Sequence, residues 1–306
     1  FAINHGLEIV VDGVDNTDRL YAWAKWIQAQ GHGWLSMLFD QAFIAHEDSE
    51  LPENIADLPS ALPLLPYTQV RDTAVKYMEE AIALLEAANY TIPASWIPDR
   101  ERTSAELARA GHSYIAQYYV YGARTPAERA ALPWQTILDH IDQGITEDFE
   151  VDLNSQNSMF SNLMTRMQTT GTFSAWGDYK LIGPADTSGN FAAWLALPLS
   201  ERARFLIHTP DKRITGATPT SHGEFFRYRA DNIFRPERGL YHHSHYQWRR
   251  NQGRTNTGTY PLIRVDEMNL IRAEALYYLG RLDEAADMVN ITRTRERTTQ
   301  RIVTAD

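Results

Sequence analysis

The chain has 306 residues and a formal net charge of −10, with 43% hydrophobic and 22% charged residues and no cysteine. This composition is that of an ordinary globular protein with enough apolar residues for a substantial core, and it excludes disulfides, thiolate metal sites and a cysteine nucleophile. The excess of acidic over basic residues argues against nucleic acid as a partner. No apolar run approaches the roughly 20 residues that span a bilayer, and the chain begins at Phe1 without a leader pattern, so we expect a mature, trimmed or partial chain.

Two long helical patterns in the first 90 residues predict a helical hairpin. The first covers about residues 17–47, with apolar residues near helical spacing. Gly31 and Gly33 in this helix would allow another helix to approach closely. The second pattern covers about residues 68–89, after a loop rich in proline and acidic residues.

A second hairpin is predicted between about residues 103 and 147. Thr103, followed by Glu106 three residues later, has the spacing of a capping box at the start of its first helix. Its second helix is expected over about residues 127–147, with a break at Pro133 because proline removes a helical hydrogen bond.

Residues 148–260 differ from the rest of the chain. Helical periodicity fades, and the segment is rich in small polar residues, histidine and aromatic residues, whose density argues against disorder. Residues 1–150 carry 9 Lys and Arg against 23 Asp and Glu, whereas residues 200–254 carry 11 against 5, together with five of the ten His. We therefore expect an acidic helical scaffold with a long, irregular, basic insert.

A third hairpin is predicted over about residues 261–297, with its turn at Gly280. Small residues at Ala273 and Ala275 would let a neighbouring helix approach, and an Asp-Glu pair opens the second helix, where negative charge suits the helix dipole. This alternation of small and large residues around a glycine turn is the tetratricopeptide pattern. One such hairpin cannot bury both of its faces, so it predicts partner hairpins, which the two earlier segments supply.

The third hairpin resembles the SusD/RagB family of outer-membrane nutrient-binding lipoproteins. That family typically shows the pattern L-I-R-x-A-E-x-x-L-x-x-A-E-A-x-x-x-L-G-x-x-x-E-A-x-x-x-(I/V)-N-x-x-R in its C-terminal helix pair. The positions of this chain that fit it are Leu262, Ile263, Arg264, Glu267, Ala273, Glu274, Ala275, Leu279, Gly280, Glu284, Ala285, Asn290 and Arg293. A second stretch, AKWIQAQGHGWLSMLFDQAF at residues 24–43, is similar to the family's first long helix.

The resemblance implies a mostly α fold of tetratricopeptide-like (SusD-like) helical hairpins with a long irregular, loop-rich insert, forming a single domain over residues 1–306. It implies a non-enzymatic, surface-exposed outer-membrane protein that binds a glycan or peptide and works with a TonB-dependent SusC-like transporter. Membrane attachment would come only through an N-terminal lipid anchor. The family's lipidated cysteine and the segment that usually follows its last helix pair are not in this sequence, so we expect either a part of a longer protein or a divergent member.

The aromatic residues of the insert are the best candidates for a ligand site, because sugar rings stack on flat aromatic faces beside polar groups that orient them. The candidates are Trp176, Asp178, Tyr179, Trp194, Tyr241, His243, Tyr246, Trp248 and Arg249. The alternative for each ring is a place in the insert's own core. We expect at least two rings to line the site. The basic insert suggests acidic or phosphorylated ligands, although Arg and His also serve neutral sugars.

No cofactor or metal is expected. His243 and His245 alternate, which on a strand would place both on one face, but two imidazoles without a third ligand do not make a metal site. The acidic segment 46–57 has oxygen ligands that suit Ca²⁺ but lacks the order of an EF-hand, so no motif supports a structural calcium ion.

Two other classes of function remain open. The helical hairpins suit a tetratricopeptide-type scaffold for protein–protein interaction. A carbohydrate-active hydrolase would need a pair of carboxylates such as Asp178 and Asp186, which no catalytic motif marks. We therefore expect no catalytic residues.

Overall fold

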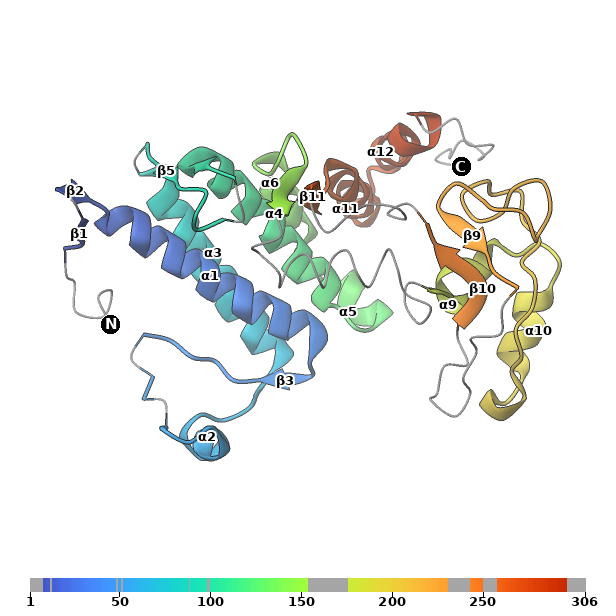
Figure 1. Cartoon of the computed structure of the whole chain (residues 1–306), viewed down its shortest axis with the longest axis horizontal. Coiled ribbons are helices and arrows are strands. Elements are labelled where there is room, and N and C mark those ends of the chain that lie inside the picture. The colour runs from blue at the N-terminus through green and yellow to red at the C-terminus, as the bar shows by residue number, and fades with distance from the viewer. Residues whose placement is uncertain are drawn as a thin grey trace. The chain divides into compact units, whose positions relative to one another are not determined.

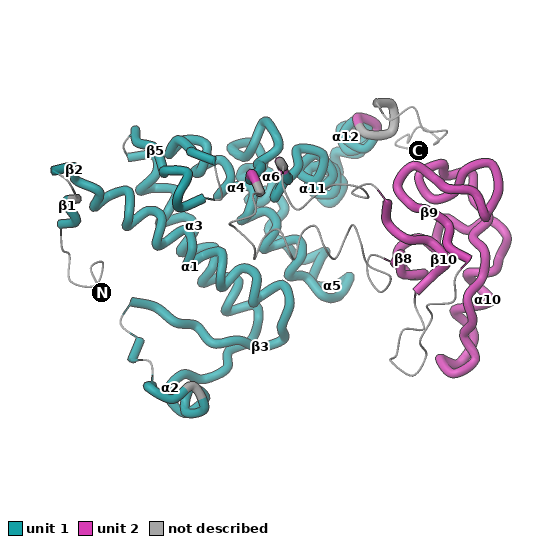
Figure 2. Tube along the Cα trace, viewed as in Figure 1, with its two compact units in different colours: residues 1–151, 260–289, 304–306 teal, residues 152–259, 290–303 magenta. Residues whose placement is uncertain are grey.

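The chain divides into two compact units in a computed structural model (Figures 1 and 2). Unit 1 comprises residues 1–151, 260–289 and 304–306, and unit 2 comprises residues 152–259 and 290–303. The described residues are 8–11, 13–47, 49–50, 52–87, 89–97, 100–153, 176–230, 243–249 and 258–295. The longer segment of unit 2, residues 152–259, has nearly the same bounds as the predicted insert, residues 148–260. That the whole chain acts as a single domain stays a prediction.

Unit 1 is built mainly from helices, which confirms the predicted mostly α fold of helical hairpins. Its helices are α1 (Thr17–Leu38), η1 (Ile55–Asp57), α2 (Leu58–Ala61), α3 (Tyr67–Glu86), α4 (Ser104–Gly122), α5 (Pro126–Ala130), α6 (Trp134–Asp142), α11 (Val265–Tyr278) and the first part of α12 (Leu282–Arg295). Short strands pair as β1 (Val10–Val11) with β2 (Val14–Asp15), β3 (Gln41–Ala42) with β4 (Leu65–Pro66), β5 (Thr91–Ile92) with β6 (Arg102–Thr103), and β7 (Phe149–Leu153) with β11 (Gly258–Ile263). Among the described helices, none is long and apolar enough to cross a membrane.

Helices α1 and α3 pack along each other as the first hairpin, and α4 packs against both. A Cβ atom added at Gly33 would stand 2.2 Å from Cε1 of Tyr118, so this glycine is required by the close approach of α4. The predicted close contact is confirmed at Gly33. A Cβ at Gly31 would meet no atom within 4 Å, so the prediction is wrong at that position.

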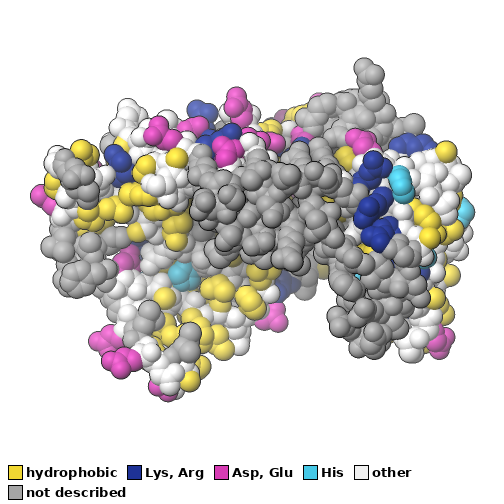
Figure 3. Space-filling view, in the orientation of Figure 1, with side chains coloured by type: hydrophobic (Ala, Val, Ile, Leu, Met, Phe, Trp, Pro, Cys, Tyr) yellow, Lys and Arg dark blue, Asp and Glu magenta, His cyan; other side chains and the backbone are white. Residues whose placement is uncertain are grey.

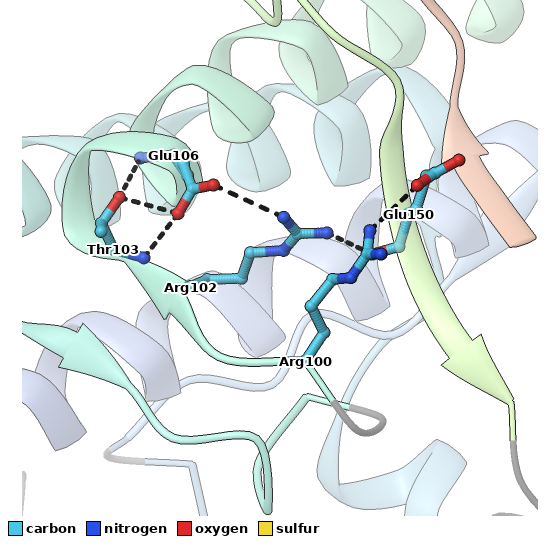
Figure 4. Close-up of polar contacts among 5 residues, drawn as sticks. All are labelled: Arg100, Arg102, Thr103, Glu106 and Glu150. Carbon is cyan, nitrogen blue, oxygen red and sulfur yellow. Dashed lines mark hydrogen bonds and ion pairs between the residues drawn. The ribbon is translucent and has the colours of Figure 1, made fainter. Parts of the chain in front are cut away.

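Helix α4 begins with the predicted capping box (Figure 4). The hydroxyl of Thr103 accepts a hydrogen bond from the backbone N–H of Glu106 (3.2 Å), and the Glu106 carboxylate accepts one from the backbone N–H of Thr103 (2.8 Å). Arg102 donates to Glu106 (3.5 Å) and to the backbone carbonyl of Glu150, and Arg100 donates to the Glu150 carboxylate (2.9 Å). These contacts tie the start of α4 to β7.

The predicted second helix of the second hairpin is two shorter helices, α5 and α6, separated at Pro133 as expected. Arg129 of α5 pairs with Glu274 of α11, with Nη2 of the arginine 2.6 Å from Oε2 of the carboxylate. The turn between α11 and α12 contains Gly280 at φ 77°, a left-handed conformation that glycine adopts without steric cost. Ala273 and Ala275 of α11 are buried, in agreement with their predicted packing role.

Unit 2 contains a three-stranded sheet in the order β8 (Trp176–Asp178), β10 (His243–Trp248), β9 (Phe226–Tyr228). Short helices accompany it: α9 (Tyr179–Ile182), η3 (Gly183–Ala185), α10 (Asn190–Ala196) and η4 (Leu199–Glu201). The unit has its own core, formed by Tyr179, Ile182, Trp194, Ile207, Ile214, Phe226 and Tyr246. The segment predicted as irregular therefore contains a small sheet over an aromatic core.

Candidate ligand-binding site

The sheet of unit 2 has one face toward the core and one face away from it. Tyr246 is fully buried in the core, and side chains alternate along a strand, so Gln247 belongs to the opposite, outer face. Gln247 pairs with Trp176 on β8 and with Arg227 on β9. These three side chains therefore form a row across the outer face of all three strands.

Arginines gather around this row. Oε1 of Gln247 accepts hydrogen bonds from Nε of Arg227 (2.9 Å) and from Nη1 of Arg229 (3.2 Å). The guanidinium carbons of Arg204 and Arg229 lie 5.2 Å and 5.5 Å from the ring centroid of Trp176, within cation–π range. We call the set Trp176, Arg204, Arg227, Arg229, His245 and Gln247 the arginine face.

The arginine face concentrates positive charge. Burial lowers the pKa of Arg227, and the charges of Arg229 and Arg249 lower it further. Burial likewise lowers the pKa of Arg204. The pKa of His245 is lowered by burial and by the charge of Arg204, so this imidazole is neutral near pH 7. Figure 3 shows Lys and Arg side chains gathered beside a His on the side of unit 2 that carries β9 and β10.

Three of the predicted site residues belong to the core. Tyr179 and Tyr246 are fully buried and Trp194 is 3% exposed. The Tyr179 hydroxyl donates to the carbonyl of Phe205 (2.7 Å), and the Tyr246 hydroxyl donates to that of Pro219 (2.9 Å). These three rings present no open face to a ligand, and their evident role is to hold unit 2 together.

Two further predicted residues also contribute to the fold. Trp248 is half-buried against the core, with its ring edge-on to Phe226 at a centroid distance of 5.4 Å. Asp178 caps α9, accepting a hydrogen bond from the backbone N–H of Lys180 (2.7 Å).

Of the four remaining predicted residues, three lie in the part of the chain that the structure describes. Trp176 is half-buried and forms part of the arginine face. His243 pairs with Asp178 in the sheet, and Arg249 is exposed directly after β10. Tyr241 lies outside the described residues. The participation of any of these side chains in ligand binding stays a prediction.

Sequence reasoning did not single out Arg204, Arg227, Arg229 and Gln247, although it found the excess of positive charge in this part of the chain. The alternation of Arg227 and Arg229 is a signal that they share one face of an extended segment. Using that signal would have required the position of β9, whose three residues are too few to show a period of two.

The carboxylates that a hydrolase would need are engaged locally. Asp186 accepts hydrogen bonds from the N–H groups of His208 (2.9 Å) and Phe191 (3.2 Å) and from the hydroxyl of Ser188 (2.9 Å). Burial alone would raise the pKa of Asp186, but these donors outweigh it and hold the pKa below its usual value. A carboxylate that is ionised and already accepts several hydrogen bonds is poorly suited to general-acid catalysis. Within the described part of the chain, no three His, Asp or Glu side chains are grouped to hold a metal ion.

Unit 1 holds a different titratable cluster, beside a cavity of about 480 Å³ that His112 helps to line. Nδ1 of His112 lies 2.8 Å from Nδ1 of His140, so one ring donates and the other accepts. Burial, and then the nearby His112, lower the pKa of His140 to about 4, and burial lowers that of His112. Both rings are therefore neutral near pH 7.

Comparison with known proteins identifies the family. The sequence model of the SusD family matches residues 109–305, more than half of the chain. The chain belongs to the SusD family. This confirms the resemblance seen in the C-terminal hairpin, and the matched range includes the described parts of the sheet of unit 2.

One solved structure supports the fold. A SusD-like carbohydrate binding protein from Bacteroides vulgatus matches with a TM-score of 0.51 at 16% identity, covering 94% of this chain and 57% of that one. A SusD superfamily protein from the same species matches with a TM-score of 0.48 at 14% identity, covering 94% and 60%. The present chain thus spans less than two thirds of the length of these SusD proteins. A search of curated proteins gave no match.

Proposed function

We propose that this SusD-family chain is a non-enzymatic nutrient-binding protein of the outer membrane surface, which binds a glycan and works with a TonB-dependent SusC-like transporter. The observation that carries the proposal is the family match together with Trp176, an aromatic ring set among polar side chains on the outer face of unit 2. Sugar rings are bound by this combination of a flat apolar surface and a few oriented donors.

The arginine face has the donors that such a site needs. Guanidinium groups present several N–H donors in a fixed plane, which suits the hydroxyl and carboxylate groups of sugars. Gln247 fixes the orientation of Arg227 and Arg229 through its amide oxygen. The local engagement of Asp178 and Asp186 supports binding rather than hydrolysis.

Helix α1 offers a surface for the transporter. Ile27, Trp34 and Leu38 are 50%, 54% and 64% exposed, and their spacing places them along one side of the helix. Gly31 lies between them, and a Cβ atom added at this glycine would meet no atom within 4 Å. An exposed apolar stripe of this kind is typical of a protein-interaction surface. It supports the assignment of α1 to the contact with the transporter.

The ligand proposal is tested by screening the whole chain against glycan and peptide arrays, with Trp176→Ala and Tyr277→Ala as matched variants. Tyr277 is an exposed aromatic residue of α11 in unit 1, so its loss removes a ring from outside the candidate site. We expect Trp176→Ala to weaken glycan binding about tenfold, the equivalent of one ring contact, and Tyr277→Ala to leave it unchanged. Absence of glycan binding by the native chain, or release of shortened sugars from the bound oligosaccharide, would contradict the proposal.

The transporter proposal is tested by co-purification from outer membranes, with the barrel identified by mass spectrometry. Trp34→Glu places a charge in the apolar stripe of α1 and should abolish recovery of the barrel, because burying an unpaired charge is strongly unfavourable. Leu181→Glu is the control, since Leu181 is 73% exposed on α9 of unit 2. Recovery of a soluble protein in place of a barrel would favour the tetratricopeptide-type scaffold.

A further inference from the structure

We propose that Nε2 of His245 accepts a hydrogen bond from a glycan hydroxyl, and that the arginine face therefore selects sugars that present a free hydroxyl group at this point. This inference rests on the proposed function, since it takes the ligand to be a glycan. It adds the side chain that recognises the glycan and the group of the glycan that this side chain contacts.

His245 lies on the outer face of the sheet of unit 2. It precedes Gln247 by two residues on β10, and its neighbours in the strand, Ser244 and Tyr246, are both fully buried. Because side chains alternate along a strand, His245 shares the outer face with Gln247. Its backbone carbonyl accepts a hydrogen bond from the N–H of Arg229 (2.8 Å), directly after β9.

A second hydrogen bond fixes the tautomer of this histidine. Nδ1 of His245 lies 3.2 Å from the backbone carbonyl oxygen of Arg229. A carbonyl oxygen can only accept, so Nδ1 carries the proton and Nε2 of the neutral ring has a lone pair. Burial lowers the pKa of His245, and the charge of Arg204 lowers it further against the opposing effect of this hydrogen bond. The ring is therefore neutral near pH 7, and Nε2 is an acceptor.

This acceptor is accessible. Within the described part of the chain, Nε2 of the half-buried His245 ring has no hydrogen-bond partner and is not buried from solvent. The internal bond of Nδ1 to the carbonyl of Arg229 holds the ring in place. A ligand group thus meets an acceptor whose orientation is set before binding, which reduces the entropy lost on binding.

The other side chains of the arginine face make this acceptor distinctive. Guanidinium groups and the indole of Trp176 are donors only. The remaining side-chain acceptor is the amide oxygen of Gln247, which already accepts from Arg227 (2.9 Å) and Arg229 (3.2 Å). A ligand group that donates a hydrogen bond to a side chain of this face is therefore directed to His245.

A sugar hydroxyl is such a donor. An ether, an ester or an ionised carboxylate at the same place offers only lone pairs, which the lone pair of Nε2 repels. A site built to hydrogen-bond a hydroxyl discriminates strongly against analogues that lack it, because its polar group is left unpaired. The arginine face should therefore distinguish a sugar from its deoxy or O-methyl form at one position.

Nitrogen-15 NMR of the whole chain, labelled at histidine, tests the tautomer without a ligand. Near pH 7 we expect His245 to be protonated on Nδ1 and unprotonated on Nε2, with its signals assigned by their loss in His245→Gln. His222 is the internal comparison: its Nδ1 accepts the backbone N–H of Tyr228 (3.2 Å), so its neutral ring should carry the proton on Nε2. A proton on Nε2 of His245 would overturn the inference.

Two variants separate the acceptor from the internal hydrogen bond. His245→Asn places an amide N–H near the position of Nδ1 and has no acceptor at that of Nε2, whereas the longer His245→Gln can place its amide oxygen there. We expect His245→Asn to weaken glycan binding about tenfold and His245→Gln to retain most of the affinity. A purely structural role of the histidine predicts the reverse order. If His245→Asn fails to fold, as judged by thermal denaturation, His245→Phe replaces it.

Titration calorimetry then identifies the hydroxyl. The probes are cellopentaose, xylopentaose, maltopentaose and any oligosaccharide bound on the arrays, followed by the monodeoxy forms of the tightest binder. We expect one deoxy form to lose about tenfold in affinity for the native chain and less than about twofold for His245→Asn, because the two changes remove the same hydrogen bond. His222→Asn alters an exposed histidine of the same unit and should leave all affinities unchanged.

The outcomes separate the two proposals. If a glycan binds but no hydroxyl is coupled to His245, or if His222→Asn has the same effect as His245→Asn, the inference is wrong while the proposed function stands. If no oligosaccharide binds in calorimetry or on the arrays, the proposed function fails and the inference fails with it.

Discussion

The arginine face of unit 2 and two ion pairs of unit 1 hold their arginines in different ways. In unit 1, arginines form ion pairs with carboxylates of other segments, as in Arg129 with Glu274 and Arg124 with Asp40. On the arginine face of unit 2, Arg227 and Arg229 converge on the amide of Gln247, and Arg229 also lies over an indole ring. In these unit 1 pairs the acceptor of the arginine is a carboxylate of the scaffold, whereas the acceptor that Arg227 and Arg229 share is a neutral amide oxygen.

The aromatic residues show a related contrast within unit 2. Tyr179, Trp194 and Tyr246 fill the core, and Trp176 lies on the outer face. Because the unit is small, a few large rings provide much of its buried apolar area. High aromatic density in such a segment therefore indicates a compact core first, and a binding surface only where a ring lies on the outside.

The largest expected loss of stability comes from replacing a core tryptophan with alanine, and replacing the tryptophan on the outer face is the comparison. Trp194→Ala removes a buried ring and should destabilise unit 2 by about 3–5 kcal/mol, whereas Trp176→Ala should cost no more than about 1 kcal/mol. Denaturant unfolding followed by near-UV circular dichroism measures both. Equal losses would show that Trp176 belongs to the core, and the distinction between the two rings would fail.

The scaffold of unit 1 should be most sensitive where helices approach closely. Gly33→Ala places a methyl group 2.2 Å from a ring carbon of the buried Tyr118 and should destabilise the protein by about 2 kcal/mol. Gly31→Ala is the matched control, because its methyl group meets no atom within 4 Å and alanine favours a helix by up to about 1 kcal/mol. Thermal denaturation should therefore move in opposite directions for the two variants.

The helical unit could be predicted from the sequence because its signals are local. The capping box at Thr103 and the break at Pro133 each depend on a few neighbouring residues. The sheet of unit 2 could not be predicted in the same way. Its strand β8 pairs with β10 more than 60 residues later in the chain, and β8 and β9 have three residues each. The arginine face depends on that long-range pairing. The sequence therefore showed the excess of positive charge in this part of the chain, but not which arginines come together.

Acid should weaken unit 1 through its histidine pair. The pKa of His140 is about 4 in the folded chain and near 6.5 in an unfolded one, so between these values the unfolded state binds a proton that the folded state does not. Stability should fall by about 2 kcal/mol as pH drops through this window, less than the full shift because the ring is partly exposed. Nearby Asp139 opposes the shift, and Glu86 lies 3.9 Å from Nε2 of His112.

Urea unfolding at several pH values measures this loss, with His140→Gln as the comparison. The amide can still hydrogen-bond to His112 but cannot titrate. The variant should therefore lose less stability than the native chain between pH 6.5 and 4, while carboxylate titration affects both equally. Parallel curves for the two proteins would mean that the pair does not control acid stability.

The smallest effect should come from the capping box. Thr103→Ala removes the hydroxyl that accepts the N–H of Glu106 and should destabilise α4 by about 1 kcal/mol, whereas Thr103→Ser keeps the hydroxyl and should restore most of the loss. The cap belongs to unit 1, so glycan affinity should be the same for both variants at temperatures where they are folded. A change in glycan affinity would show that the start of α4 influences binding. The division between a scaffold and a ligand-binding unit would then need revision.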